Sequence, residues 1–367
     1  MDLPRSPNLH IDKLAAVFNN TTNTYKYYWF LALLEQMSYY NSEISISDLV
    51  VTMISKVWYP VNYFRLSFGK QDKLADAVQS VKKTLEFEKD IDQERLKENI
   101  KDHLEKKEIK RSIHNLSRFV PYRFLSPWFS SELRGMPDQR KDRAIVDFAA
   151  RDFIKDENPP PYRFDPSRGT IVLHSGWRDY FNRHVKILRG YTLWHLLDFL
   201  RKRNPNVPNI QTKLFPPQQR DLKEAARFWN LYFDIWPEIS CIYSGELVTP
   251  GNFSIDHFVP WSFVTHDQLW NLLPVPHHIN SAKGDRLPAE KHLEDFEALQ
   301  YDAFHRVLQK FPGQPKLMED YNILFNDSLH NIRQKPREQF RETLGETIRP
   351  LMQIAGNMGF EEEWQYI

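Results

Sequence analysis

The stretch that decides the local fold is CIYSGELVTPGNFSIDHFVPWSFVTHDQLWNLLPVPHHINSAKGDRLP, residues 241–288. Residues 241–248 are strand-like, and a turn at 249–252 separates them from a second short strand at 253–255. This order predicts a β-hairpin that ends at Asp256-His257. Residues 278–283 are expected to begin a helix, with Asn280 in its first turns.

The polar residues of this stretch point to chemistry at a metal ion. A carboxylate (Asp256), a neighbouring histidine (His257) and an amide oxygen on a following helix (Asn280) can surround one hard cation. Oxygen ligands with open water positions suit Mg²⁺ or Mn²⁺. The histidine can then take a proton from water that attacks phosphorus, while the metal offsets charge on the phosphate.

This segment resembles the HNH endonuclease family, whose fold is a small hairpin-plus-helix unit called ββα-metal. The matching motif is Asp256-His257, then Asn271 fourteen residues after the histidine, then Asn280 nine residues further on. An Asn-x-x-Lys-x-Asp pattern ends it. The spacing is similar to that of the HNH domain in RNA-guided DNA nucleases, and the resemblance covers about 50 of the 367 residues.

The resemblance implies a role for each matching position. His257 is expected to be the general base, and Asp256 and Asn280 are expected to hold Mg²⁺ or Mn²⁺. Asn271 is expected to bridge the loop and orient the catalytic histidine. The substrate-contacting side chains expected in this segment are Lys283 and Arg286.

One departure from the family concerns a structural zinc. Many HNH proteins of this type carry two Cys-x-x-Cys pairs, which would fall here at Cys241 with Ser244 and at Pro276 with Ile279. Three of the four ligands are missing, and a tetrahedral zinc site cannot be built from the remaining cysteine. We therefore expect no structural zinc.

Outside this segment the sequence favours helices. Apolar residues recur with helical spacing and only 12 glycines occur, so we expect a mainly α protein with a small α+β unit inserted near the C-terminal third. The apolar run at 27–34 is too short to span a membrane and is expected to be a buried helix. Four segments are expected: a helical N-terminal domain at 1–116, a mostly helical basic region at 117–232, the nuclease unit at 233–292 and a helical region at 293–367.

Charge is distributed unevenly along a chain whose formal net charge is only +1. Residues 163–227 contain 13 Lys and Arg against five Asp and Glu, with aromatic residues such as Trp194 between them. This pattern fits a nucleic-acid-binding face. The alternative is that the arginines scatter over several surfaces and the aromatic residues belong to the core. The predicted DNA contacts in this segment are Arg201, Lys202 and Arg203.

The resemblance implies a metal-dependent endonuclease that hydrolyses phosphodiester bonds in DNA, in bacterial restriction or phage defence, with other proteins of a defence system as partners. The alternatives are an RNA nuclease and a nucleic-acid-binding regulatory subunit of a multi-protein defence complex. The single cysteine and the absence of an apolar run in MDLPRSPNLH favour a cytoplasmic protein with no membrane partner.

Overall fold

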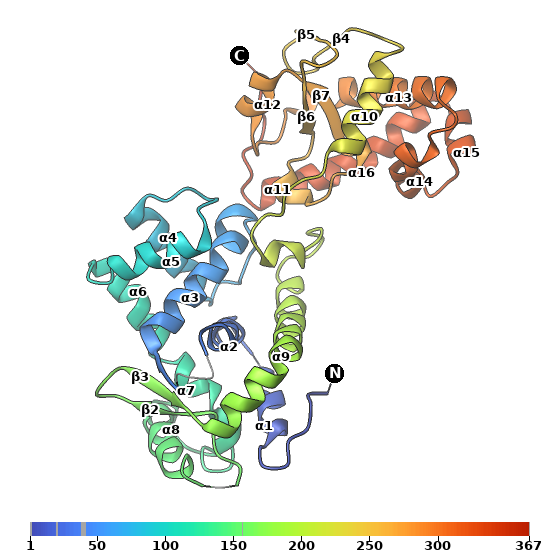
Figure 1. Cartoon of the computed structure of the whole chain (residues 1–367). Helices are drawn as coiled ribbons and strands as arrows, with labels where there is room; N and C mark the ends of the chain where they lie inside the picture. Colours follow the sequence, from blue (N-terminus) through green and yellow to red (C-terminus); the bar gives the residue numbers. More distant parts are fainter. Residues whose placement is uncertain (1, 20, 38–41, 156, 367) are drawn as a thin grey trace. The chain divides into compact units, whose positions relative to one another are not determined.

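The computed structural model describes residues 2–19, 21–37, 42–155 and 157–366. The chain forms two compact units, one of residues 1–205 with 213–216 and the other of residues 206–212 with 217–367 (Figure 1). The sequence suggested four segments, whereas tertiary contacts join the first of them to most of the second, and the nuclease unit to the C-terminal helices. The fold is mainly α with a few short strands, which confirms the predicted fold class.

The first unit is built around α2 (Tyr25–Gln36), in which every residue from Tyr27 to Leu34 is buried. The apolar run is therefore a buried helix, as predicted. It packs against α3 (Ile46–Trp58), α7 (Val120–Phe124) and α9 (Ser175–Arg201). The other helices of this unit are α1 (Ile11–Ala15), η1 (Ala16–Phe18), η2 (Tyr59–Tyr63), α4 (Lys73–Leu85), α5 (Gln93–Asp102), α6 (Lys107–Ser117), η3 (Ser126–Phe129), α8 (Asp138–Asp152) and η4 (Thr212–Leu214).

A small antiparallel sheet completes the first unit. Its strands are β1 (Glu43–Ser45), β2 (Tyr162–Asp165) and β3 (Thr170–Leu173), in the order β1-β3-β2. Buried and half-buried residues alternate along β2 and β3, as expected of a sheet with one face against the core. No helix in the described part of the chain has the length and apolar character needed to cross a membrane.

The second unit contains two short strand pairs. β4 (Ile239–Ser240) pairs with β5 (Leu247–Val248), and β6 (Ser254–His257) pairs with β7 (Leu272–Val275). The predicted hairpin between 241–248 and 253–255 is therefore wrong. Three of the four residues of β6 and all four residues of β7 are buried, so β6 needs an apolar partner strand, and 272–275 supplies it from farther along the chain.

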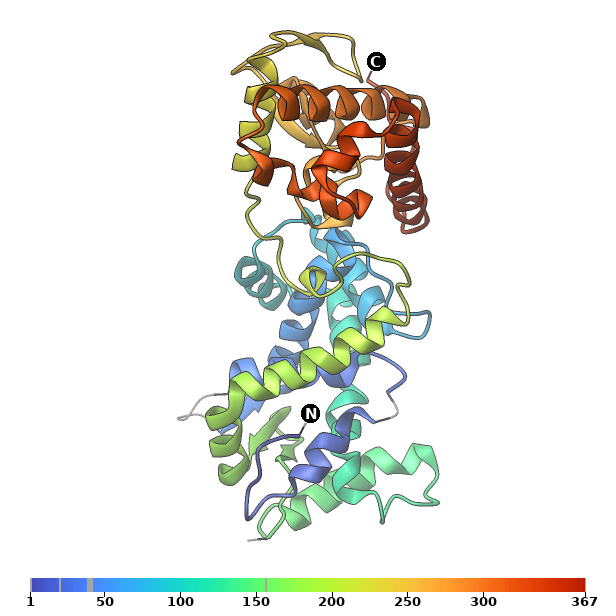
Figure 2. The same cartoon turned by 90° about the vertical axis from the view of Figure 1, so that its right-hand side faces the viewer.

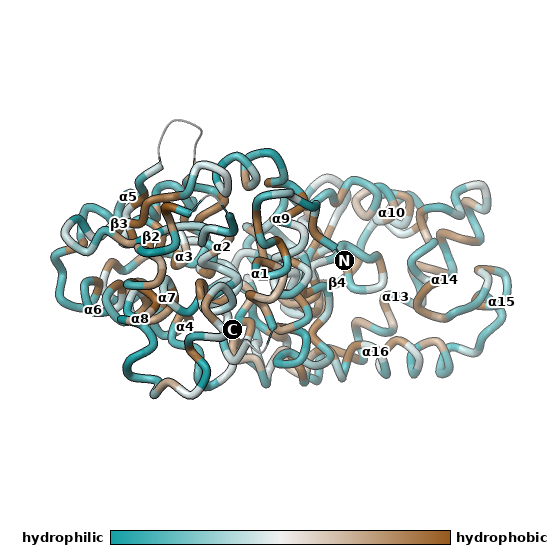
Figure 3. The backbone as a smooth tube through the Cα atoms, turned by 90° about the horizontal axis from the view of Figure 1, so that it is seen from below, coloured by the Kyte–Doolittle hydropathy of each residue, from teal (hydrophilic) through white to brown (hydrophobic). Residues whose placement is uncertain are grey.

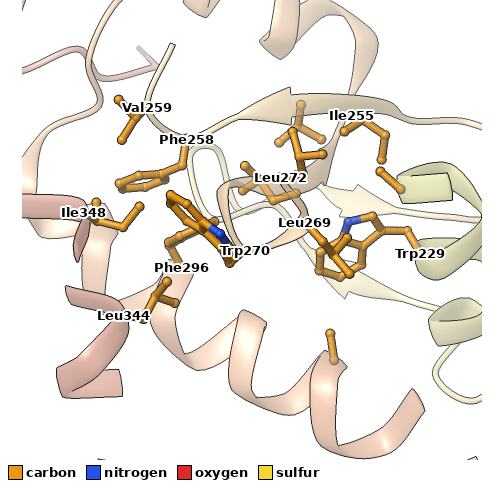
Figure 4. Packing of buried hydrophobic residues seen from close by; sticks show 14 of the residues in the cluster. Trp229, Ile255, Phe258, Val259, Leu269, Trp270, Leu272, Phe296, Leu344 and Ile348 are labelled. Atoms are coloured by element: carbon orange, nitrogen blue, oxygen red, sulfur yellow. The ribbon is translucent and has the colours of Figure 1, made fainter. Parts of the chain in front are cut away.

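Helices enclose this strand pair and complete the core of the second unit. The ring of Phe258 stacks on Phe296 of α13 (Leu293–Lys310) with centroids 4.2 Å apart, and Leu344 and Ile348 of α16 (Arg337–Asn357) close the same cluster (Figure 4). Hydrophilic and hydrophobic residues alternate along α16, as expected of a helix with one buried face (Figure 3). The remaining helices are α10 (Lys223–Phe233), α11 (Trp261–Val264), η5 (Leu269–Asn271), α12 (His277–Lys283), η6 (Glu290–His292), η7 (Pro315–Met318), α14 (Glu319–Phe325) and α15 (Leu329–Gln334).

Candidate functional site

His257 is the last residue of β6, and its side chain is 3% exposed. Its Nε2 atom lies 2.8 Å from Oδ1 of Asp267, in the loop that leads to η5. The other ring nitrogen, Nδ1, has no hydrogen-bond partner among the described residues. Burial lowers the pKa of His257, and the nearby carboxylates of Asp267 and Asp256 act in the opposite direction. Burial therefore favours the neutral imidazole, which is the form that can accept a proton.

Asp256 lies beside His257 on β6 and is also almost fully buried. Its Oδ2 accepts a hydrogen bond of 3.0 Å from the Tyr243 hydroxyl. The ammonium of Lys283 lies 3.1 Å from Oδ1 and 3.0 Å from Oδ2 of the same carboxylate. A carboxylate has about four lone-pair positions, so these contacts leave one position free, on Oδ1.

Lys283, at the end of α12, is completely buried. In addition to Asp256, its ammonium donates a hydrogen bond of 2.6 Å to the backbone oxygen of His257. Burial lowers the pKa of Lys283, and the carboxylate of Asp256 opposes that shift. The expectation that Lys283 approaches a phosphate conflicts with this geometry, because its charge is already paired inside the protein. Its contacts instead anchor α12 to β6.

Asn271 closes the loop that follows β6. Its Oδ1 accepts a hydrogen bond from the backbone nitrogen of Val259, and its Nδ2 donates one to the backbone oxygen of the same residue, both 2.9 Å long. Its own backbone oxygen accepts a bond of 2.9 Å from the nitrogen of Phe258. These three bonds hold the backbone directly after His257, and the Asn271 side chain, which is wholly buried, makes no hydrogen bond to the His257 ring.

Asn280 lies on α12, one helical turn before Lys283, and is half-buried. Its side chain makes no hydrogen bond within the described residues. A free amide oxygen and the remaining lone pair of Asp256 are the donors that a hard cation such as Mg²⁺ or Mn²⁺ prefers, with water completing its shell. The described residues contain no group of three or more His, Cys, Asp or Glu that could hold a metal ion by itself. The donor types of Asp256 and Asn280 thus suit a hard divalent cation, for which water would have to supply the rest of the shell.

The other predicted substrate contacts differ in their availability. Arg286 donates from Nε to the backbone oxygen of Lys283 at 3.1 Å, and its guanidinium lies over the Trp364 ring, so it braces the C-terminal segment. In the first unit, Arg203 packs on the Phe199 ring with its Cζ 3.4 Å from the centroid. Lys202 forms an ion pair of 2.6 Å with Asp198. Arg201 is exposed and has no ion pair in the part of the chain that the structure describes.

Three residues near the site were not identified by sequence reasoning. Asp267 and Tyr243 contact His257 and Asp256 respectively, and neither occupies a motif position that would have singled it out. Arg220 is exposed, lies over the Trp261 ring, and is close enough to His257 to disfavour its protonated form. Its only sequence signal was its place in the basic segment.

The positions of the zinc ligands found in many HNH proteins lie in an apolar setting. Cys241 and Ile279 are both buried in the hydrophobic cluster of the second unit. The Ser244 hydroxyl accepts the backbone N–H of Glu246 within the turn between β4 and β5. Packing and turn hydrogen bonds account for this region, and the absence of zinc stays a prediction.

Comparison with known families agrees with the motif. Residues 241–289 match the sequence model of the family described as HNH endonuclease. The matched range contains β5, β6, β7 and α12, together with Asp256, His257, Asn271 and Asn280. No curated protein and no solved structure matches the chain. Residues 241–289 are thus an HNH endonuclease domain.

Proposed function

We propose that this HNH endonuclease domain hydrolyses phosphodiester bonds in DNA with the aid of a divalent metal. The observation that carries the proposal is the His257 side chain, buried and held through Nε2 by Asp267, with Nδ1 left without a protein partner. A histidine held at one nitrogen and open at the other is suited to act as a general base.

The roles of the two acids beside His257 follow from their contacts. Asp267 accepts a hydrogen bond from the Nε2–H group, so the proton of the neutral ring stays on Nε2 and its lone pair is on Nδ1. Nδ1 then takes a proton from the water that attacks phosphorus. Asp256 and Asn280 would hold Mg²⁺ or Mn²⁺, and such an ion, when bound, offsets the negative charge of the phosphate. The ammonium of Lys283 already neutralises Asp256, so we expect the metal to bind weakly.

Exposed cations support a nucleic-acid substrate. Arg220 lies in the same unit as His257 and is free to contact a phosphate next to the scissile bond. The choice of DNA over RNA rests on the resemblance to DNA-cutting HNH domains. A role in bacterial restriction or phage defence, in the cytoplasm and with other defence proteins as partners, rests on the same resemblance.

Plasmid cleavage tests the proposal. The purified chain is incubated with supercoiled plasmid and Mg²⁺ or Mn²⁺, beside His257→Ala and the matched control His330→Ala, an exposed histidine of the same unit. We expect nicked circles, because one site cuts one strand at a time, and a rate at least about 10²-fold lower for His257→Ala alone. Equal survival of plasmid with wild type and His257→Ala would refute nuclease activity on DNA. Labelled RNA, run in parallel, separates the RNA alternative.

A further inference from the structure

α9 lies at the outer side of the first unit, as two perpendicular views show (Figures 1 and 2). A kink at His184, with φ −112° and ψ 16°, separates its first turns from a long straight part. On that part, Ile187, Gly190 and Trp194 follow one another at intervals of three and four residues, so they share one face of the helix. Trp194 is 62% exposed and Ile187 is 46% exposed. The face is thus apolar and open to solvent.

Cations border this apolar face. Arg201 lies seven residues after Trp194, which places it on the same side of the helix, and Lys186 lies one turn before Gly190 at the edge of that side. Both side chains are exposed, and neither has an ion pair within the described residues. Asp198 lies one turn after Trp194 on the same side of the helix, and its carboxylate is paired with Lys202 at 2.6 Å. The face therefore presents unneutralised positive charge around an exposed indole.

Gly190 has no packing role that the chain itself explains. Glycine in a helix interior costs about 1 kcal/mol relative to alanine. A Cβ atom added at Gly190 would meet no other atom within 4 Å, so no neighbouring segment requires its absence. Its bare backbone leaves open space between Ile187 and Trp194, which a flat group from a bound molecule can enter.

We propose that this face, defined as the Trp194 stripe of Lys186, Ile187, Gly190, Trp194 and Arg201, binds an unpaired nucleic-acid strand. Trp194 stacks on one base, Gly190 admits the edge of that base, and the cations contact the flanking phosphates. A duplex covers both faces of each base with its neighbours, so an exposed indole favours a single strand. The inference rests on the proposed function only in taking a nucleic acid as the ligand.

Binding of a labelled oligonucleotide tests the stripe. Fluorescence anisotropy is measured with full-length His257→Ala protein, so that no cleavage occurs, on a 20-nucleotide single strand and on the matching duplex. We expect Trp194→Ala to weaken single-strand binding at least about fivefold, the loss that corresponds to one stacked base. The matched control is Trp236→Ala, which removes a tryptophan that is 49% exposed in the other unit. It should leave the affinity unchanged.

Two further variants separate binding from folding. Gly190→Ala should raise the helix stability and the melting temperature, yet weaken binding, because the methyl group fills the space that the base enters. Arg201→Ala should lower the slope of log affinity against log salt by about 0.7, the value for one phosphate contact on a single strand. A Gly190→Ala protein that is more stable and binds as well as its parent would count against the stripe.

The outcomes also distinguish this inference from the nuclease proposal. If the wild type nicks plasmid but Trp194→Ala binds the single strand as tightly as its parent, the stripe is overturned and the nuclease stands. If Trp194→Ala weakens binding and no nucleic acid is cut, the stripe stands without the nuclease. Duplex binding as tight as single-strand binding, with equal loss in Trp194→Ala, would refute the preference for an unpaired strand.

Discussion

The substitution Lys283→Met tests the most deeply buried charge of the site. The Lys283 ammonium lies 3.0 and 3.1 Å from the two carboxylate oxygens of Asp256 and 2.6 Å from the backbone oxygen of His257. The exposed fractions of the two side chains are 0% and 4%. Methionine has a similar length but no charge, so the variant removes all three contacts and leaves the carboxylate with the Tyr243 hydroxyl as its neighbour.

The expected cost follows from this burial. Removal of one partner of a buried ion pair costs about 3–5 kcal/mol, because the remaining charge is left uncompensated. Every 1.4 kcal/mol is a factor of ten, so the opening equilibrium of β6 should rise by roughly 100- to 4,000-fold. The double variant Lys283→Met with Asp256→Asn removes both charges and should recover all but about 1 kcal/mol. If the double variant recovers this stability, the loss in Lys283→Met comes from the unpaired charge of Asp256 and not from side-chain packing.

Hydrogen exchange followed by mass spectrometry measures the opening equilibrium of β6 separately from the rest of the chain. Peptides that span β6 and β7 report on the site, and peptides from α2 serve as an internal reference because they belong to the other compact unit. If Lys283→Met lowers the free energy of opening of β6 by less than about 1 kcal/mol, the buried pair does not stabilise this strand. A double variant that is no more stable than Lys283→Met would refute the role of charge pairing.

Four further predictions concern the base, the core and the metal. The carboxylate of Asp267 favours the protonated form of His257, so Asp267→Asn should lower the pKa of His257 and move the acidic limb of the cleavage rate to lower pH. The plateau rate should also fall, because the imidazole ring loses the charge that holds it. An acidic limb at the same pH as in the wild type would contradict this role of Asp267. Burial lowers the pKa of His257 in the folded chain below 6.5, so the unfolded chain binds more protons just below that pH. The free energy of unfolding should therefore fall as the pH drops through this window. In urea unfolding at several pH values, His257→Gln should make this fall less steep. Phe296→Ala should cost about 3–5 kcal/mol of stability, since the ring is wholly buried and stacked on Phe258, and a loss under 1 kcal/mol in urea unfolding would show that the cluster repacks. Chelation by EDTA should abolish cleavage and added Mg²⁺ or Mn²⁺ should restore it, whereas activity that survives EDTA, or one tightly held zinc per chain by elemental analysis, would contradict the proposed metal chemistry.

Local sequence was enough to identify the family and the helical character of the chain. The spacing of Asp256, His257, Asn271 and Asn280 is a property of short segments, and the family match at 241–289 agrees with it. The apolar run in α2 predicted a buried helix, because eight successive apolar or aromatic residues leave no polar face to expose. The strand partner of β6 was beyond this reasoning, since the turn at 249–252 resembles a hairpin turn and the true partner lies fifteen or more residues away.

The sequence by itself determined which residue types lie in the candidate site, because the motif orders them along β6, η5 and α12. Only the tertiary structure decided their contacts. Lys283 has the charge of a phosphate ligand, yet α12 packs against β6 and turns that charge inward to Asp256. Asp267 has no motif position, yet the loop before η5 brings it to Nε2 of His257. The physical reason is desolvation: a buried charge or ring nitrogen must find a partner, and the folded backbone determines which partner is within reach.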